Sequence, residues 1–268
     1  MKITLAQIYQ TKLQEVAQRQ SAQPLGALRT RAEAAPPPLD FLAALSKRQP
    51  GSEVEPAWPA LIAEIKFASP SKGVLRTERD PLALARCFQQ NGAAAISVLT
   101  DETYFQGSLE ILAQVVQMQP GLPVLRKDFL LDPYQVYEAR TAGAAAVLLI
   151  VAFIDNARLQ DLHRLANELG LAVLVEVHTA AELERALDCS PHLVGINHRD
   201  LNTFQIDSTA SLRLRPLIPS GILTVAESGI RSRLDVRRLA QAGLDAILVG
   251  ETLVTAPDTA AKVRELAA

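Results

Sequence analysis

The sequence has few cysteines, few aromatic residues and no excess of charge of either sign. Cys87 and Cys189 are its only cysteines among 268 residues, so a disulfide framework or a four-thiolate zinc site cannot form. Lysine and arginine number 27 against 29 aspartates and glutamates. The resulting net charge of -2 provides no uniform positive field for binding a nucleic acid.

Long hydrophobic runs are also absent. The longest, 142–154, is shorter than the roughly 18 residues of a membrane span. The opening decapeptide MKITLAQIYQ lacks the continuous apolar stretch of a secretory signal. We therefore expect a cytoplasmic protein in a reducing compartment that binds neither a membrane nor a nucleic acid.

Short apolar runs recur from residue 60 onwards, in a chain that is 49% hydrophobic. The runs lack polar alternation, which is typical of parallel strands buried on both faces. Each is followed by a more polar stretch of helical character. The eight runs span 61–65, 95–99, 123–125, 146–151, 171–175, 193–196, 221–226 and 246–249.

Helix signals lie between these runs. Asp-Pro pairs at 80–81 and 132–133 place a capping carboxylate before a proline, and the stretch 179–182 has the pattern of a capping box. Eight strand-helix units predict an α/β fold, a (β/α)8 TIM barrel that forms one domain over 1–268. A doubly wound sheet would need a G-x-G-x-x-G turn after its first strand, and the sequence has none. Glycines expected to end helices are Gly92, Gly143, Gly170 and Gly243.

Residues 1 to about 50 form a separate amino-terminal extension. Leu5, Ile8, Leu13 and Val16 recur at roughly helical spacing, and three prolines at 36–38 break the pattern. The extension has seven basic and three acidic residues, whereas the remainder is acidic on balance. Such a helix could cover a ligand site, but we favour the simpler interpretation of a solvated helix docked on the barrel.

Polar residues end several of the predicted strands, where barrels carry their chemistry. The period of two in Glu64-Ile65-Lys66 places both charges on one face. Glu64, Lys127, Glu176 and Glu227 belong to alternate strands, so they could form one interior layer of compensated charge. We expect one carboxylate with a raised pKa and a lysine whose pKa is lowered enough for general acid catalysis. The strand-end residues are Glu64, Lys66, Lys127, Glu176, Asn197 and Glu227.

Glycines follow the last two predicted strands, at Ser228-Gly229 and at Gly250. Backbone N–H groups in these positions commonly bind phosphate in barrels. The loop Ser69-Pro70-Ser71-Lys72-Gly73 is interpreted either as a mobile lid or as an exposed loop. Tyr104, Phe105 and Phe129 follow the second and third strands and could form an apolar shelf for an aromatic substrate, or simply pack the loops. The four histidines show no metal-binding spacing.

Together these residues resemble the indole-3-glycerol phosphate synthase family of tryptophan biosynthesis. The similarity extends through nearly all of the chain, in the family's order. The matching stretches are PPLDFLAAL (37–45), IAEIKFASPSKG (62–73), SVLTDETYFQGSLE (97–110), RKDFLLDPYQ (126–135), LVEVHT (174–179), GINHRDL (195–201) and AESGI (226–230).

This resemblance implies a barrel lyase that closes 1-(2-carboxyphenylamino)-1-deoxyribulose 5-phosphate to indole-3-glycerol phosphate, with loss of carbon dioxide and water. It implies no metal and no organic cofactor, and it leaves other tryptophan-pathway enzymes open as partners. By matching positions, Lys127 resembles the general acid and Glu176 the acid/base group of the dehydration. Glu64 and Lys66 resemble their partners, while Glu227 and Asn197 resemble residues that position the substrate hydroxyls and the lysines.

The resemblance also implies a set of substrate-binding residues. Ser69 and Phe129 resemble contacts to the anthranilate half. Two positions depart from the family's pattern: His198 stands where Asn or Ser is expected, and Glu251 stands where some relatives have a hydroxyl. Because a carboxylate repels phosphate, we expect Glu251 to offer only its backbone N–H. The substrate-binding residues are Ser69, Phe129, Arg199, Ser228, Gly229, Gly250 and Glu251.

Two other functions compete with this assignment. Phosphoribosylanthranilate isomerase, a related phosphate-binding barrel, uses a cysteine after its first strand, where this chain has Glu64 and Lys66. A non-catalytic barrel that binds a phosphorylated metabolite would keep the glycines without needing Lys127 and Glu176 together.

Overall fold

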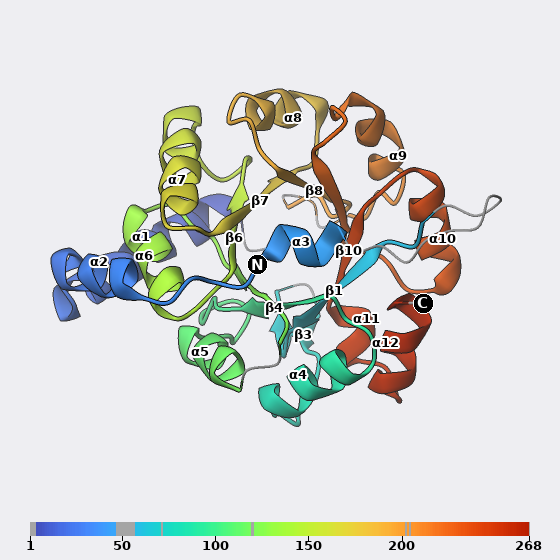
Figure 1. Cartoon of the computed structure of the whole chain (residues 1–268), viewed down its shortest axis with the longest axis horizontal. Helices are drawn as coiled ribbons and strands as arrows, with labels where there is room; N and C mark the ends of the chain where they lie inside the picture. Colours follow the sequence, from blue (N-terminus) through green and yellow to red (C-terminus); the bar gives the residue numbers. More distant parts are fainter. Residues whose placement is uncertain are drawn as a thin grey trace.

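Eight parallel strands close into a barrel in the computed structural model, which describes residues 4–46, 57–70, 72–118, 121–201, 203 and 205–267. Each strand pairs with the next along the chain, and the last pairs with the first through Ala60 and Ala246 (Figure 1). The predicted (β/α)8 fold is therefore confirmed. The barrel strands are β1 (Ala60–Ile65), β4 (Ala95–Leu99), β5 (Val124–Lys127), β6 (Ala146–Ile150), β7 (Ala172–Val177), β8 (Leu193–Asn197), β9 (Leu223–Glu227) and β10 (Ala246–Val249).

Polar residues extend four strands beyond their apolar runs, and in β8 the added residue is Asn197. β5 continues through Arg126 and Lys127. The Arg126 guanidinium can be wholly buried there because it is paired with Asp128 and Glu138. β7 likewise includes Glu176, and β9 includes Glu227. An apolar run ends where side-chain chemistry changes, whereas a strand ends where its ladder of backbone hydrogen bonds ends.

The helices surround the barrel and begin at the predicted caps. Asp80 and Asp132 each accept a backbone N–H of the first turn. The box expected at Thr179 is only half formed, because the Glu182 carboxylate accepts the backbone N–H of His178 instead. The helices are α4 (Pro81–Gln90), α5 (Leu109–Gln117), α6 (Pro133–Thr141), α7 (Asn156–Glu168), α8 (Ala180–Leu187), α9 (Ala210–Leu214), the 3-10 turn η1 (Arg215–Leu217), α10 (Arg233–Gln241), α11 (Glu251–Val254) and α12 (Thr259–Ala267).

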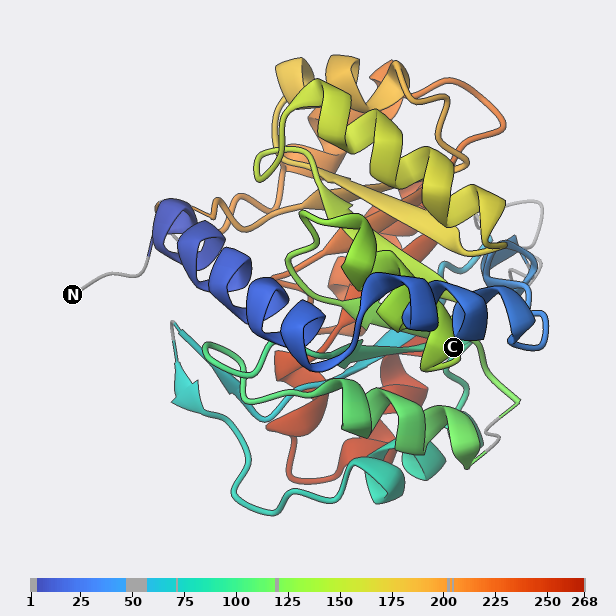
Figure 2. The same ribbon diagram turned by 90° about the vertical axis from the view of Figure 1, so that its left-hand side faces the viewer.

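Three helices precede the barrel. α1 (Leu5–Ala22) and α2 (Leu25–Ala34) pack against α6 on the outside, and α3 (Phe41–Ser46) contacts β1, β4 and β9 (Figures 1 and 2). The helix predicted from the spacing of Leu5, Ile8, Leu13 and Val16 is α1. Its buried side chains are Ile8, Lys12 and Val16, whereas Leu13 is 41% exposed. None of the helices in the described ranges combines the length and apolar character of a membrane span.

Candidate active site

Four charged side chains from alternate strands meet at the carboxyl ends of the barrel. Lys127 Nζ of β5 lies 3.4 Å from Glu176 Oε2 of β7 and 3.4 Å from Glu227 Oε2 of β9. Lys66 Nζ lies 3.6 Å from Glu64 Oε1 of β1. All five side chains line one cavity, together with Asn197. The convergence expected from the strand order is therefore observed.

Glycines on neighbouring strands make room for two of these carboxylates. A Cβ added to Gly195 of β8 would overlap Glu227 Oε1, and one added to Gly250 would overlap Glu64 Oε1. The interior of a barrel is filled in layers, so a large side chain on one strand needs a small residue beside it. Gly250 thus has a packing role in addition to the phosphate-binding role expected from its position.

Burial and the mutual attraction of the charged side chains shift their pKa values. Burial lowers the pKa of Lys127, but attraction by Glu227, Glu176 and Glu64 outweighs it and leaves the pKa above its ordinary value. The expectation of a lowered lysine pKa was therefore wrong. Burial, with repulsion from the other carboxylates, outweighs the attraction of Lys127 and raises the pKa of Glu227 to about 8.

Glu176 behaves in the opposite way. Burial favours its neutral form, but attraction by Lys127 and His178, helped by a hydrogen bond from Asn197, outweighs this and lowers its pKa. At neutral pH the site therefore holds an ammonium at Lys127, a carboxylate at Glu176 and a neutral carboxyl at Glu227. Two buried carboxyl groups with pKa values pushed apart are the usual basis for separate acid and base roles.

His178 is a partner of Glu176 that the sequence reasoning passed over. Its Nε2 lies 3.6 Å from Glu176 Oε1, and its Nδ1 lies 3.0 Å from Glu182 Oε2. Burial alone would lower its pKa, but the hydrogen bond to Glu182 and both carboxylate charges raise it. The available signal was spacing: His178 comes two residues after Glu176 and four before Glu182.

The residues expected to bind phosphate also line the cavity. Ser228 and Gly229 have positive φ angles of 67° and 75°, which turns the chain sharply after β9. The cavity is lined here by Arg199, Ser228, Gly229, Gly250 and Glu251. Arg199 Nη2 lies 3.7 Å from Glu251 Oε2, so a cation compensates the carboxylate that we expected to repel a phosphate.

His198 supports the Ser228 turn. Its Nδ1 lies 3.0 Å from the carbonyl oxygen of Ser228, and its Nε2 lies 2.7 Å from Ser211 Oγ. Burial lowers the pKa of the ring. A neutral imidazole that donates from Nδ1 and accepts at Nε2 satisfies both contacts. His198 therefore stabilises the Ser228 turn by hydrogen bonding, so this departure from the family's pattern has a structural role.

Aromatic rings pack together beside the cavity and form a wall of Phe105, Phe129 and Phe153. The ring centroids of Phe105 and Phe129 are 6.1 Å apart, and those of Phe129 and Phe153 are 5.2 Å apart. Phe105 and Phe129 line the cavity, as the shelf interpretation expected. Tyr104 does not line it, because its hydroxyl lies 2.7 Å from Thr11 Oγ1 of α1.

The amino-terminal helix also contributes to this cavity. Leu5 and Ile8 of α1 are among the lining residues, so the helix borders the cavity as well as docking on the barrel. Ser69, in the short hairpin β2 (Ala68–Ser69) and β3 (Gly73–Val74), lines the cavity too, whereas Ser71 lies outside the described residues.

Several buried polar atoms of the site have no hydrogen-bond partner in the protein. Among the described residues these include Ser69 Oγ, Glu176 Oε1 and Glu227 Oε1. Buried polar atoms are normally paired, so unpaired ones that line a cavity are consistent with bonds to a ligand. No group of three or more His, Cys, Asp or Glu side chains within the described part of the chain is arranged to hold a metal ion.

Comparison with known proteins identifies the family. The profile of indole-3-glycerol phosphate synthase matches residues 5–266. The enzyme of that name from Roseiflexus castenholzii is 50% identical over 273 residues, covering 99% of this chain and 98% of its own. That from Dehalococcoides mccartyi is 51% identical over 232 residues, or 86% of each chain.

Solved structures with low sequence identity share the fold. 3-Hexulose-6-phosphate synthase from Salmonella typhimurium has a TM-score of 0.61 at 16% identity, and covers 78% of this chain and 96% of its own. The tryptophan synthase alpha-subunit of Pyrococcus furiosus has a TM-score of 0.59 at 17% identity, covering 77% and 97%. The full-length sequence match, together with this fold, shows that the chain belongs to the indole-3-glycerol phosphate synthase family.

Proposed function

We propose that the protein is an indole-3-glycerol phosphate synthase, a carboxy-lyase of tryptophan biosynthesis. Its substrate would be 1-(2-carboxyphenylamino)-1-deoxyribulose 5-phosphate, and its products indole-3-glycerol phosphate, carbon dioxide and water. The observation that carries the proposal is the Lys127 ammonium 3.4 Å from two buried carboxyl groups, in a cavity that an aromatic wall and a glycine turn also line. The cavity thus offers one region for each part of this substrate.

The first step forms a carbon–carbon bond. The ring carbon that bears the carboxylate attacks the ribulose carbonyl carbon, and Lys127 donates a proton to the carbonyl oxygen as negative charge develops there. A developing alkoxide is more basic than an amine, so an ammonium with a raised pKa can still donate. Carbon dioxide then leaves, and the electrons of the broken bond restore the aromatic ring.

The second step removes water. Glu176, which its lowered pKa keeps ionised, accepts a proton from the substrate and returns it to the hydroxyl made in the first step, which leaves as water. Lys127 regains its proton from solvent. Glu64 and Lys66 form the neighbouring ion pair that assists these transfers. Asn197 and the neutral carboxyl of Glu227 would hold the substrate hydroxyls.

The two ends of the substrate are assigned to opposite sides of the cavity. Ser69 and Phe129 would contact the anthranilate half. The backbone at Ser228, Gly229 and Gly250, with the N–H of residue 251, would hold the phosphate, and Arg199 would add a cation there. Binding energy from a phosphate remote from the reacting atoms orients a flexible chain for ring closure.

The direct test supplies the carboxyphenylamino deoxyribulose phosphate to the purified protein and follows indole fluorescence. We expect a signal that grows with time and with enzyme concentration. Binding of the substrate without any indole signal, by protein shown to be folded by circular dichroism, would contradict the proposal and favour a non-catalytic barrel.

A further inference from the structure

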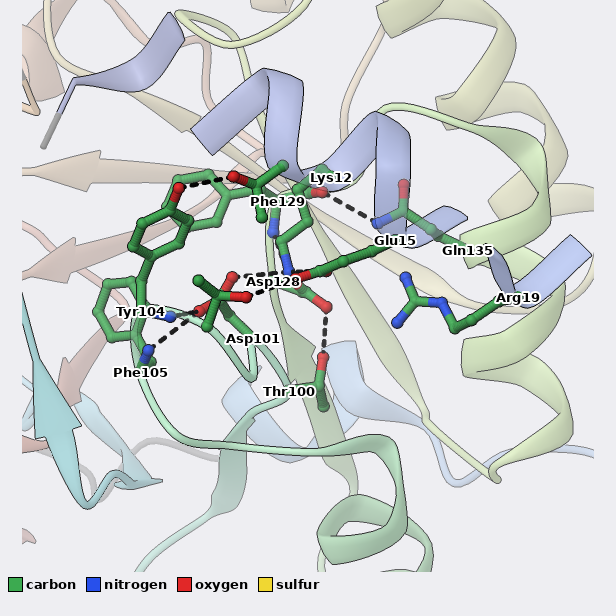
Figure 3. Close-up of polar contacts among 12 residues, drawn as sticks. Lys12, Glu15, Arg19, Thr100, Asp101, Tyr104, Phe105, Asp128, Phe129 and Gln135 are labelled. Atoms are coloured by element: carbon green, nitrogen blue, oxygen red, sulfur yellow. Dashed lines mark hydrogen bonds and ion pairs between the residues drawn. The ribbon is translucent and has the colours of Figure 1, made fainter. Parts of the chain in front are cut away.

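Lys12 is a buried cation in the middle of the barrel-facing side of α1. Its side chain is 0% exposed, and its Nζ lies 2.6 Å from Asp101 Oδ2, 2.8 Å from Glu15 Oε2 and 3.1 Å from Asp128 Oδ1 (Figure 3). Burial alone would lower its pKa, but attraction by Asp128 and Asp101 outweighs this and raises it. A charge is buried at such a position only when it is well compensated.

The two aspartates belong to the loops that follow β4 and β5, and each holds backbone of its own loop. Asp101 Oδ1 accepts the N–H groups of Tyr104, at 2.6 Å, and of Phe105, at 2.9 Å. Asp128 Oδ1 accepts the N–H of Phe129 at 2.8 Å. Lys12 thus pairs with both carboxylates, as Figure 3 shows. One of these carboxylates accepts the backbone N–H of Phe105 and the other that of Phe129.

Phe105 and Phe129 are the two residues of the aromatic wall that line the cavity. Asp128 also directly follows Lys127 in the chain. A shift of either aspartate would therefore move the wall relative to the charged layer.

α1 also docks through contacts that do not involve Phe105 or Phe129. Arg19 Nε lies 3.1 Å from Glu138 Oε1, and the hydroxyl of Tyr134 donates to the carbonyl of Arg19 at 3.0 Å. Ile8 and Val16 bury apolar side chains on either side of Lys12. An apolar residue at position 12 could dock the helix without the cost of burying charge, but it could not pair with Asp101 and Asp128. The two loops would then keep the hydrogen bond from Thr100 Oγ1 to Asp128 Oδ2, at 2.7 Å, without the ion pairs of Lys12.

We propose that Lys12 is a positioning residue, which joins Asp101 to Asp128 and thereby fixes the wall of Phe105 and Phe129 against which the aromatic half of the substrate stacks. The identity of that substrate rests on the proposed function, whereas the link between Lys12 and the wall does not. Lys12 itself does not touch the reacting atoms.

The first test measures amide hydrogen exchange in Lys12→Met, with Arg19→Met on the same helix as the matched control. We expect the amides of Phe105 and Phe129 to exchange at least tenfold faster in Lys12→Met and within about twofold of wild type in Arg19→Met. Equal protection of these amides in Lys12→Met and wild type would overturn the proposal. This measurement needs no substrate, so its outcome is independent of the proposed function.

The second test separates the two ends of the cavity by using anthranilate and inorganic phosphate as probes. In Lys12→Met we expect the dissociation constant of anthranilate to rise at least tenfold, while that of phosphate stays within twofold. For the complete substrate, KM should rise by a larger factor than kcat falls. Equal weakening of both probes would mean a general structural defect and would overturn the proposal.

A third variant keeps the inference testable if Lys12→Met does not fold. Lys12→Met combined with Asp101→Asn removes the uncompensated carboxylate and leaves an amide oxygen to accept the loop N–H groups. We expect this double variant to fold and still bind anthranilate at least fivefold more weakly than wild type, because no ion pair through position 12 then joins position 101 to Asp128. Wild-type anthranilate affinity in the double variant would show that Lys12 only balances charge.

Discussion

At the scale of single residues, the chemistry depends on how the carboxyl groups of Glu176 and Glu227 share one cation. Lys127 is held between Glu176 and Glu227, and the three protonation states follow from burial and mutual attraction. The residue types and their strand-end positions were predictable from the sequence. The direction of the Lys127 pKa was not, because it is a sum over charges from separate strands whose distances only the folded protein sets.

Replacing Lys127 by Ala should lower turnover at least about a hundredfold, because it removes the proton donor for the developing alkoxide. Substrate affinity should fall far less, since the phosphate and the aromatic ring are bound elsewhere. Steady-state kinetics with a separate binding measurement would check both. The matched control is Lys262→Ala, which removes a lysine paired with Glu265 outside the cavity and should leave turnover unchanged. Full activity in the Lys127 variant would refute its role as acid.

At the scale of elements, local signals were good guides to where helices and strands begin. Asp80 and Asp132 cap helices as predicted, and the glycines expected to end helices at 92, 143, 170 and 243 all have positive φ. The apolar spacing predicted the helix α1 but not the composition of its inner face, where Ile8, Lys12 and Val16 are buried. Sequence hydrophobicity alone would not place a lysine there, because the carboxylates that compensate it come from distant loops.

Substitution of Gly195 by alanine tests the packing of β8 against the charged layer. Gly195→Ala should destabilise the protein by about 1–3 kcal/mol, because the added Cβ meets Glu227 Oε1 and Leu174 Cδ1 in a filled barrel interior. It should also reduce activity by displacing Glu227. Urea unfolding would measure the change. Gly26→Ala is the control: its Cβ would meet nothing within 4 Å, so within α2 it should stabilise by about 0.5–1 kcal/mol. Equal stability of Gly195→Ala and wild type would contradict this packing argument.

At the scale of the whole molecule, the buried charged layer links stability to pH. In the folded protein Glu227 keeps its proton up to a pKa of about 8, whereas in the unfolded chain it loses it near the ordinary value of 4.5. Between these values the folded state binds the extra proton. The contribution of Glu227 to stability is therefore fully present below about pH 4.5 and is lost as the pH rises through about 8.

Glu227→Gln should remove this dependence. Relative to wild type, the variant should gain stability as the pH rises from 5.5 to 8.5, by at most about 1.4 kcal/mol per pH unit. Urea unfolding at several pH values would measure the difference. As a control, Asp207→Asn should leave the slope over this range unchanged, because the hydrogen bond from Arg213 lowers the pKa of Asp207 and moves its titration to more acid pH. Parallel curves for Glu227→Gln and wild type would contradict the assignment.

The sequence by itself determined the repeating strand and helix units, the ends of most helices and which strand ends carry charged side chains. These features follow from local patterns of burial, capping and backbone conformation, which neighbouring residues decide. Only the tertiary structure decided that Lys12 lies buried between Asp101 and Asp128, that α1 lines the cavity, and that Glu227 is the neutral carboxyl. Those features depend on distances between residues remote in the chain, and electrostatic energies are set by such distances and by exclusion of water.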